Sequence, residues 1–132
     1  MSIESEQLKE RTMRFGLDVL CLIDTFPRTI AGDLVSRQIA KSATSVAANY
    51  RATCVARSRA EFIAKLGLVF EEADESEFWL DVAHRKPFGD RTEVKRIHLE
   101  ARELRAIFGR SLGTARANAK RPRSVTNNQI TK

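Results

Sequence analysis

The feature that most constrains the fold of this chain is a helical spacing of apolar residues that is interrupted at only a few places. Pro and Gly, the residues that most often end helices, number three and six among 132 residues. Between them, apolar residues recur at steps of three and four, and no stretch keeps the strict alternation of a strand. The sequence therefore predicts an all-α protein.

The breaks in this pattern divide the chain into four expected helices. Pro27 ends the first helix, and the sequence KPFG ends the third. Ser58 and Asp90 each stand three residues before a Glu, which is the spacing of a capping box at the start of a helix. Helices of similar length with short connections predict an antiparallel up-down-up-down four-helix bundle over residues 1–117. The expected ranges are residues 5–25, 30–55, 58–85 and 90–117.

The second expected helix is unusually rich in small residues, as in SATSVAANYRA. Ala and Ser side chains allow a neighbouring backbone to approach closely, so this helix is expected to lie in the middle of tight packing. Tyr50 falls on its core face and should fill the core while its hydroxyl reaches a polar group. Asn49 lies off that face and is either an interhelical hydrogen-bonding residue or exposed.

Positive charge is concentrated at the C-terminal end of the chain. The net charge is +6, but residues 91–132 hold 11 Lys and Arg against 3 Asp and Glu. The last part, residues 118–132, has no apolar period and carries Pro122, so it is expected to be a disordered basic tail. Such asymmetry indicates an anionic partner, of which nucleic acid is the most common, with solubility alone as the alternative.

No pattern typical of catalysis or metal binding is present. Asp81 and His84 form one Asp-x-x-His pair without a second copy, and His98 follows a Lys at that spacing, so neither a metal nor another cofactor is expected. Cys21 and Cys54 are expected to be buried free thiols. The P-loop, dinucleotide-binding and nucleophile-elbow motifs are absent from the sequence, so we expect a non-enzyme. No apolar run could span a bilayer and the N-terminus has no signal core, so a cytoplasmic location without membrane contact is expected.

Two helices carry a second apolar strip besides the one expected to face the core. A helix in an isolated bundle needs only one apolar face, so a second strip predicts contact with another subunit. Trp79 could instead be an exposed or boundary residue. The residues expected at the oligomer interface are Met13, Leu17 and Leu20 on the first helix and Leu68, Trp79 and Val82 on the third.

The fourth helix carries the strongest candidate for a binding surface. Five cationic residues, which we call the basic stripe, fall within about 80° of each other at 100° per residue. They are Arg91, Lys95, Arg102, Arg105 and Arg116. A looser cluster on the second helix, the α2 cluster, contains Arg37, Lys41 and Arg51. Long basic side chains in a rigid row suit contacts with phosphate, which predicts nucleic-acid binding of low sequence specificity. A solvated charged face is the alternative, and the acidic residues of the third helix are expected to be solvated or to meet basic helices of another subunit.

The sequence also resembles a known family. SRQIAKSATSVAANYRA, followed by RSRAEFIAKLGLVFEEADESEFWLDV, is similar to the "four helix bundle protein" family of bacteria, also called the 23S rRNA intervening-sequence protein family. Its members share a small-residue stretch ending in Asn, then Ser-x-x-Glu-Phe, a Glu-rich helix and an aromatic-Trp-Leu segment. The resemblance covers residues 8–115. Residues 46–48, Val-Ala-Ala, replace an Ile-Pro-Ala triplet of many members, so a proline kink is not carried over.

The resemblance implies a four-helix bundle that assembles into a ring-shaped homopentamer. One relative is the accessory protein of diversity-generating retroelements, a basic barrel that binds nucleic acid and a reverse transcriptase. Other members are encoded in insertions of large-subunit rRNA genes. The family supplies no catalytic residues. Two functions are therefore expected as alternatives: an oligomeric accessory protein that binds RNA or DNA, or an oligomeric scaffold whose basic surface meets an acidic protein.

Overall fold

The computed structural model describes residues 2–121 and confirms a bundle of four helices. The helices are α1 (Ile3–Leu22), α2 (Ile30–Cys54), α3 (Arg59–Arg85) and α4 (Arg91–Lys120), and a single 3-10 turn, η1 (Ile23–Thr25), follows α1. No strand occurs within residues 2–121. In the described part of the chain, none of the helices has the length and apolar character needed to cross a membrane.

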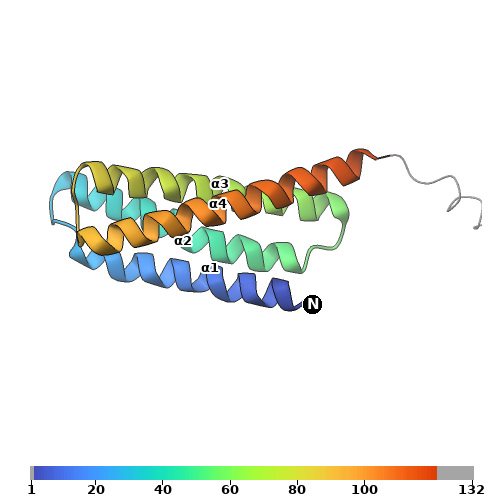
Figure 1. The fold of residues 1–132 in the computed structure, drawn as a ribbon, viewed down its shortest axis with the longest axis horizontal. Helices are drawn as coiled ribbons and strands as arrows, with labels where there is room; N and C mark the ends of the chain where they lie inside the picture. The colour runs from blue at the N-terminus through green and yellow to red at the C-terminus, as the bar shows by residue number, and fades with distance from the viewer. Residues whose placement is uncertain (1, 122–132) are drawn as a thin grey trace, which may run out of the picture.

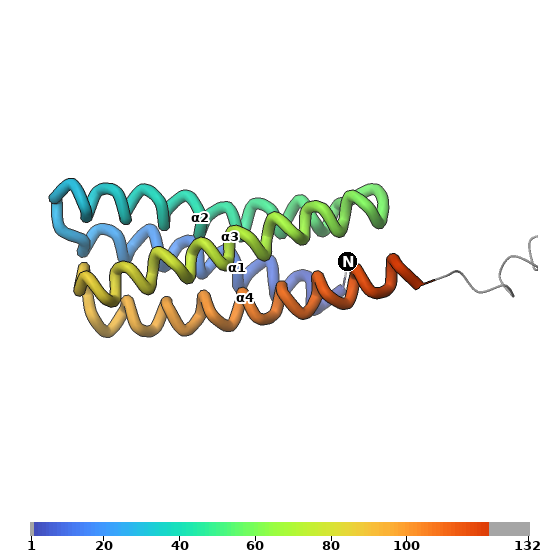
Figure 2. Tube along the Cα trace, turned by 90° about the horizontal axis from the view of Figure 1, so that it is seen from above, coloured from blue at the N-terminus to red at the C-terminus, as the bar shows by residue number. Residues whose placement is uncertain are grey.

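The four helices run antiparallel to their neighbours, as Figures 1 and 2 show. α2 packs on α1 and α3, and α4 packs on α3 and more loosely on α1, so α2 and α4 lie diagonally across the bundle. The C-terminal end of α4 extends beyond the other three helices in Figure 1. α4 continues to Lys120, past the predicted limit at residue 117. The remainder of the predicted tail, residues 122–132, lies outside the described residues.

Side chains cap the starts of α2, α3 and α4, for α3 and α4 at the positions that the sequence predicts. Thr29, Ser58 and Asp90 each accept a hydrogen bond from the backbone amide three residues later, at 3.0, 3.0 and 3.1 Å. Each of these bonds satisfies an amide that the first turn of a helix leaves without a partner. The turn before α2 also requires Gly32, because a Cβ added there would overlap the carbonyl oxygen of Pro27.

The core contains one apolar face of each helix. On α4 this face recurs at steps of three and four residues, and α1 and α2 contribute Phe15, Val19, Ile39 and Val46. The buried residues of α4 are Val94, Ile97, Ala101, Leu104, Phe108 and Leu112. The prediction of two buried cysteines is wrong for Cys21, which is exposed, while Cys54 is only partly buried; Phe62 remains 39% exposed. Cys21 points outward because its neighbours on α1, Val19 and Leu22, occupy the core side. Phe62 lies in the first turn of α3, at the end of the bundle where α1 begins and α2 connects to α3 (Figure 1), which we call the open end.

Small residues allow α2 to approach both of its neighbours. A Cβ placed on Gly16 of α1 would lie 3.6 Å from the carbonyl oxygen of Ala43, so the two backbones pass close to each other. On the other side, the hydroxyl oxygens of Ser42 and Ser76 share a hydrogen bond of 3.0 Å, and both residues are fully buried. The small-residue stretch is thus explained by packing.

The surroundings of Tyr50 and Asn49 test the two expectations for the core face of α2 and for the residue beside it. Tyr50 is buried and its ring packs against Phe108 with centroids 5.4 Å apart, as a core filler should. Asn49 donates a hydrogen bond of 2.9 Å to the Ser45 carbonyl of its own helix. Asn49 is therefore neither fully exposed nor an interhelical link.

Ion pairs join the looser edge between α1 and α4. Arg11 contacts Glu100 at 2.7 Å and Glu103 at 2.8 Å. Its hydrogen bond to Glu100 is the main reason that the pKa of the Arg11 guanidinium lies above its ordinary value. Arg96 likewise reaches Asp18 of α1 at 3.3 Å. These basic residues are engaged within the subunit and lie outside the basic stripe.

Candidate nucleic-acid interface

The basic stripe runs along the edge of α4 that faces α3, and its central arginines meet acidic residues there. Arg105 Nε lies 2.7 Å from Asp74 Oδ1, and its Nη1 lies 3.5 Å from Glu77 Oε1. Arg102 Nε lies 3.8 Å from Glu77 Oε2. The Arg105 guanidinium also lies 6.0 Å from the centre of the Phe70 ring. The acidic row of α3 is thus partly neutralised inside the subunit, an arrangement that neither sequence-based expectation for these acids included.

Arg91 has a different role from the rest of the stripe. Its guanidinium donates hydrogen bonds of 3.1, 3.0 and 2.7 Å to the carbonyl oxygens of Ala83, Phe88 and His84. These carbonyls belong to the last turn of α3 and the loop that follows, where a helix leaves acceptors without partners. Arg91 therefore fixes the turn between α3 and α4 and has few donors left for a phosphate.

Lys95 and Arg116 are the exposed ends of the stripe, and neither forms an ion pair within residues 2–121. The Arg116 guanidinium lies beside Gly67 of α3, 4.0 Å from the position that a Cβ on this residue would take. Lys120, four residues after Arg116, extends the stripe onto the protruding end of α4. The sequence analysis missed Lys120 because it ended the helix at residue 117, although the spacing of four residues was a usable signal.

The α2 cluster lies on a different side of the molecule. Arg37, Lys41 and Arg51 are exposed on the outer face of α2, diagonally across the bundle from α4. No ion pair involves them in the described part of the chain. A single subunit therefore presents two separate basic surfaces rather than one.

The apolar strip predicted on α1 forms one wall of a hollow. Met13, Leu17 and Leu20 are 41%, 54% and 40% exposed. Together with Ala48 and Arg51 of α2 they line a hollow of about 250 Å³. This exposed apolar surface beside a cation is available for contact with another protein surface.

The strip predicted on α3 is only partly free. Leu68 is 45% exposed, but Trp79 and Val82 are half-buried and pack against the core of their own subunit. The indole Nε1 of Trp79 is buried without a hydrogen-bond partner. Phe78, which the sequence analysis did not select, is 56% exposed and packs edge-on against Trp79 with centroids 4.9 Å apart. The spacing from Leu68 to Phe78 does not match a single helical strip, which explains the omission.

Two histidines lie next to the stripe. The rings of His84 and His98 have centroids 6.5 Å apart. His98 Nε2 is buried without a hydrogen-bond partner and lies 3.9 Å from Glu77 Oε2. Burial lowers the pKa of His98, while Asp81 and Glu77 act in the opposite direction. Among residues 2–121, no group of three or more His, Cys, Asp or Glu side chains could hold a metal ion.

Acidification is expected to destabilise the fold through His98. The folded protein binds a proton at His98 less readily than the unfolded chain, whose imidazole has a pKa of about 6.5. The free energy of unfolding should therefore fall as the pH drops below that value. Urea unfolding followed by circular dichroism between pH 7 and pH 5 should show a flatter pH dependence for His98→Gln than for the parent. The control is His84→Gln at the exposed neighbour. A His98→Gln slope equal to that of the parent would contradict this account.

Comparison with known proteins shows what the chain resembles. A family model described as "23S rRNA-intervening sequence protein" matches residues 4–110, which include α1, α2, α3 and most of α4. A crystal structure from Bacteroides thetaiotaomicron is described as a protein with unknown function from the S23 ribosomal protein family. It is 27% identical to this chain, with a TM-score of 0.74, and the alignment covers 84% of this chain and 99% of that one. A search of curated proteins gave no match. The matched residues contain the stripe from Arg91 to Arg105 and end before Arg116 and Lys120.

Proposed function

The chain belongs to the 23S rRNA-intervening sequence protein family, and on this premise we propose that it is a non-enzymatic, self-associating accessory protein that binds nucleic acid. The basic stripe is the proposed contact surface, with low sequence specificity. If the family includes the accessory protein of diversity-generating retroelements, as the sequence resemblance implies, a reverse transcriptase is a further proposed partner. The family resemblance also suggests a homopentamer as the assembled state.

One observation supports the stripe most directly, namely the alignment of its cations along one edge of a single helix. From Lys95 to Lys120 the row is about 38 Å long at about 1.5 Å per residue, which is close to one turn of duplex DNA, about 34–36 Å. Its members need no rearrangement of the backbone to meet phosphates. Such contacts carry no sequence information, so binding should tolerate many sequences.

The ion pairs with α3 do not exclude phosphate contacts. Exposed pairs such as Arg102–Glu77 are worth only about 0–1 kcal/mol each. A phosphate can accept two hydrogen bonds from one guanidinium and so replace a carboxylate at small cost. The acids of α3 are therefore expected to weaken nucleic-acid binding without preventing it.

The same pairs favour a second candidate function. If Asp74 and Glu77 hold the arginines permanently, the stripe is a solvated face and the protein acts as an oligomeric scaffold. The exposed apolar hollow between α1 and α2 would then be its main functional surface. The two functions differ in whether the isolated protein binds nucleic acid at low salt.

A salt titration tests the proposed function. Fluorescence anisotropy would follow binding of a labelled duplex DNA and a labelled single-stranded RNA between about 50 and about 200 mM salt. With the five cations of the row from Lys95 to Lys120 each neutralising one phosphate, log affinity should fall with log salt at a slope of about −4.5 on the duplex and about −3.5 on the single strand. Absence of binding to both probes at the lowest salt would reject the proposal and favour the scaffold.

A further inference from the structure

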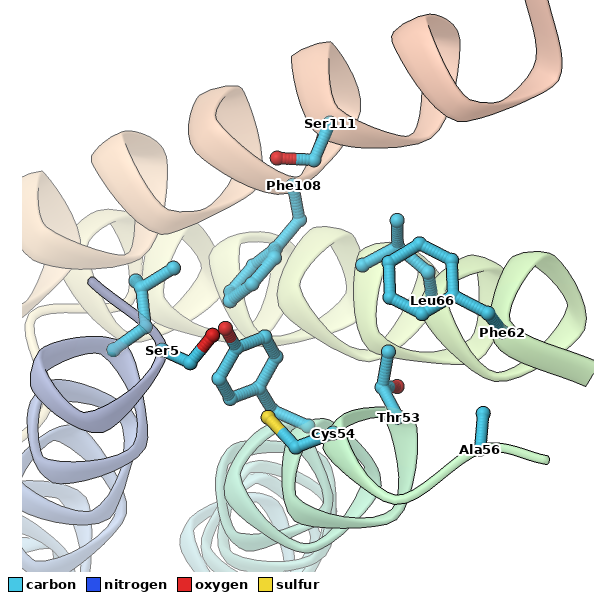
Figure 3. Close-up of a pocket in the computed structure, with 10 residues that line it drawn as sticks. Ser5, Thr53, Cys54, Ala56, Phe62, Leu66, Phe108 and Ser111 are labelled. Carbon is cyan, nitrogen blue, oxygen red and sulfur yellow. The ribbon is translucent and has the colours of Figure 1, made fainter. Parts of the chain in front are cut away.

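The open end of the bundle contains a pocket that all four helices line. This end pocket has a volume of about 410 Å³. Figure 3 shows Ser5 of α1, Cys54 of α2, Phe62 of α3 and Phe108 of α4 arranged around it. The volume lies in the range of about 300–1,000 Å³ that is typical of small-molecule sites.

The pocket exists because large side chains give way to small ones at this level of the bundle. Below it, Tyr50 and Phe108 fill the core. At the next level, Ser5, Ala56 and Ser111 face the same space and leave it open. The hollow is therefore built by the choice of small residues on α1, on α4 and in the loop after α2.

The lining combines aromatic surface with hydroxyl groups. Five of the ten lining residues carry a hydroxyl or a thiol, and the others are apolar. Burial raises the pKa of the Tyr50 hydroxyl, while a hydrogen bond with Ser5 acts in the opposite direction. The Ser5 and Thr53 hydroxyls already hydrogen-bond Ser2 and the Asn49 carbonyl, but each hydroxyl oxygen can accept a further hydrogen bond, which a hydrocarbon chain cannot supply. A flat aromatic group with donors and acceptors on its edge suits the pocket better.

Positive charge adjoins the mouth of the pocket. A second hollow, of about 260 Å³, is lined by Arg59, Phe62, Ala115 and Asn118. Phe62 belongs to both hollows, so its ring separates the end pocket from the Arg59 side chain. Arg59 is exposed and forms no ion pair within residues 2–121. An anionic group attached to the occupant could therefore contact Arg59 while the aromatic part packs on Phe62.

We propose that the end pocket binds one unstacked nucleobase of a single-stranded nucleic acid, with Phe62 as the stacking surface and Arg59 contacting the adjacent phosphate. This inference rests on the proposed function and adds to it, since the stripe alone does not distinguish a single strand from a duplex. The base edge meets the hydroxyls of Ser5, Tyr50 and Ser111. A duplex, whose bases are stacked and paired, cannot fill the pocket.

Removing the stacking surface should lower affinity for a single strand only. Base stacking on an aromatic side chain is worth about 1–3 kcal/mol per base, so Phe62→Ala should weaken single-strand binding by between about 5-fold and about 150-fold. Duplex affinity should remain within about twofold of the parent value, because the stripe is unchanged. Phe78→Ala is the matched control, since Phe78 is also an exposed phenylalanine on α3 but lies away from the pocket.

A second variant keeps the test independent of any defect in folding. Ser111→Phe fills the pocket from its exposed rim and leaves Phe62 in place, so it should cause the same selective loss. A single strand carrying 2-aminopurine reports stacking directly, and its fluorescence should be quenched by the parent and less by both variants. Equal loss of single-strand and duplex affinity, or no loss in either variant, would overturn the proposal.

A mononucleotide separates this proposal from the function of the stripe. AMP titrated into the full-length protein should shift NMR signals of Phe62 and Tyr50, even in a variant that lacks Arg102 and Arg105. If AMP shifts these signals while the protein does not bind duplex DNA, the pocket proposal is supported and the stripe proposal is rejected. If millimolar AMP leaves them unchanged, or decanoate shifts them and AMP does not, the nucleobase proposal fails whatever the stripe does.

Discussion

Replacing Arg102 and Arg105 together by Glu is expected to lower nucleic-acid affinity by about 100-fold or more at low salt. Each arginine that bonds a phosphate contributes about 1.5–3 kcal/mol as a charge-assisted hydrogen bond, and each glutamate adds repulsion. The loss should affect duplex DNA and single-stranded RNA alike, because both contacts are to phosphate. Anisotropy titrations of the parent and the double variant would measure it. In a ring that presents the stripe several times, avidity would enlarge the effect.

The double variant needs two controls for charge and fold. Arg14→Glu with Arg110→Glu gives the same change in net charge at exposed positions outside the stripe. Its affinity should fall by much less than that of the stripe variant. Circular dichroism should show unchanged helicity for both, since the pairs of Arg102 and Arg105 with α3 are exposed and weak. If both double variants bind equally well, the stripe is a solvated face.

Neutralising the acidic residues beside the stripe is expected to raise the affinity for nucleic acid. Asp74→Asn with Glu77→Gln removes the carboxylates that contact Arg105 and Arg102. If those carboxylates compete with phosphate, this variant should bind nucleic acid more tightly than the parent. An unchanged affinity would show that the arginines do not reach the phosphates.

If the protein self-associates through the hollow between α1 and α2, as proposed, Leu17→Asp is expected to yield monomers. Leu17 is 54% exposed in the hollow between α1 and α2, so the substitution should cost the isolated subunit little. Covering the hollow with another subunit would take the new carboxylate out of water, a desolvation that costs several kcal/mol and can exceed the attraction to Arg51 in the same hollow. Multi-angle light scattering at micromolar concentration should show a lower mass for Leu17→Asp than for the parent.

The control for assembly is Leu99→Asp, at a leucine of α4 that is 50% exposed and outside the hollow. It should keep the parent mass. Trp79→Asp is a less selective probe, because Trp79 packs against the core of its own subunit and its loss should also lower stability. A monomeric parent at micromolar concentration would show that the hollow does not mediate self-association.

The sequence predicted those features that depend on one helix at a time. The buried arc of α4, from Val94 to Leu112, follows directly from a spacing of three and four residues. The capping positions Ser58 and Asp90 could be predicted for the same reason, since a capping side chain and the backbone amide that it binds are three residues apart.

Features that depend on two helices could not be predicted in this way. The contact between Arg105 and Asp74 requires the axial offset of α4 relative to α3, which periodicity does not contain. Arg91 looked like its neighbours in the stripe, yet it bonds carbonyls whose position depends on the path of the α3–α4 turn. The end pocket was missed because its lining comes from four helices and the loop after α2, and no short stretch of sequence contains it.

The buried hydroxyl pair between α2 and α3 has a consequence for the uniqueness of the fold. Apolar side chains in a helix interface would tolerate a slip of one turn, about 5.4 Å along the axis, because apolar contacts have little directionality. Such a slip would break the hydrogen bond between Ser42 and Ser76 and leave each hydroxyl only a carbonyl of its own helix as a partner. Polar groups placed in this way can select one alignment of two helices over the next, as a buried Asn does in coiled coils. In this bundle, the two serines can thus favour one axial alignment of α3 on α2.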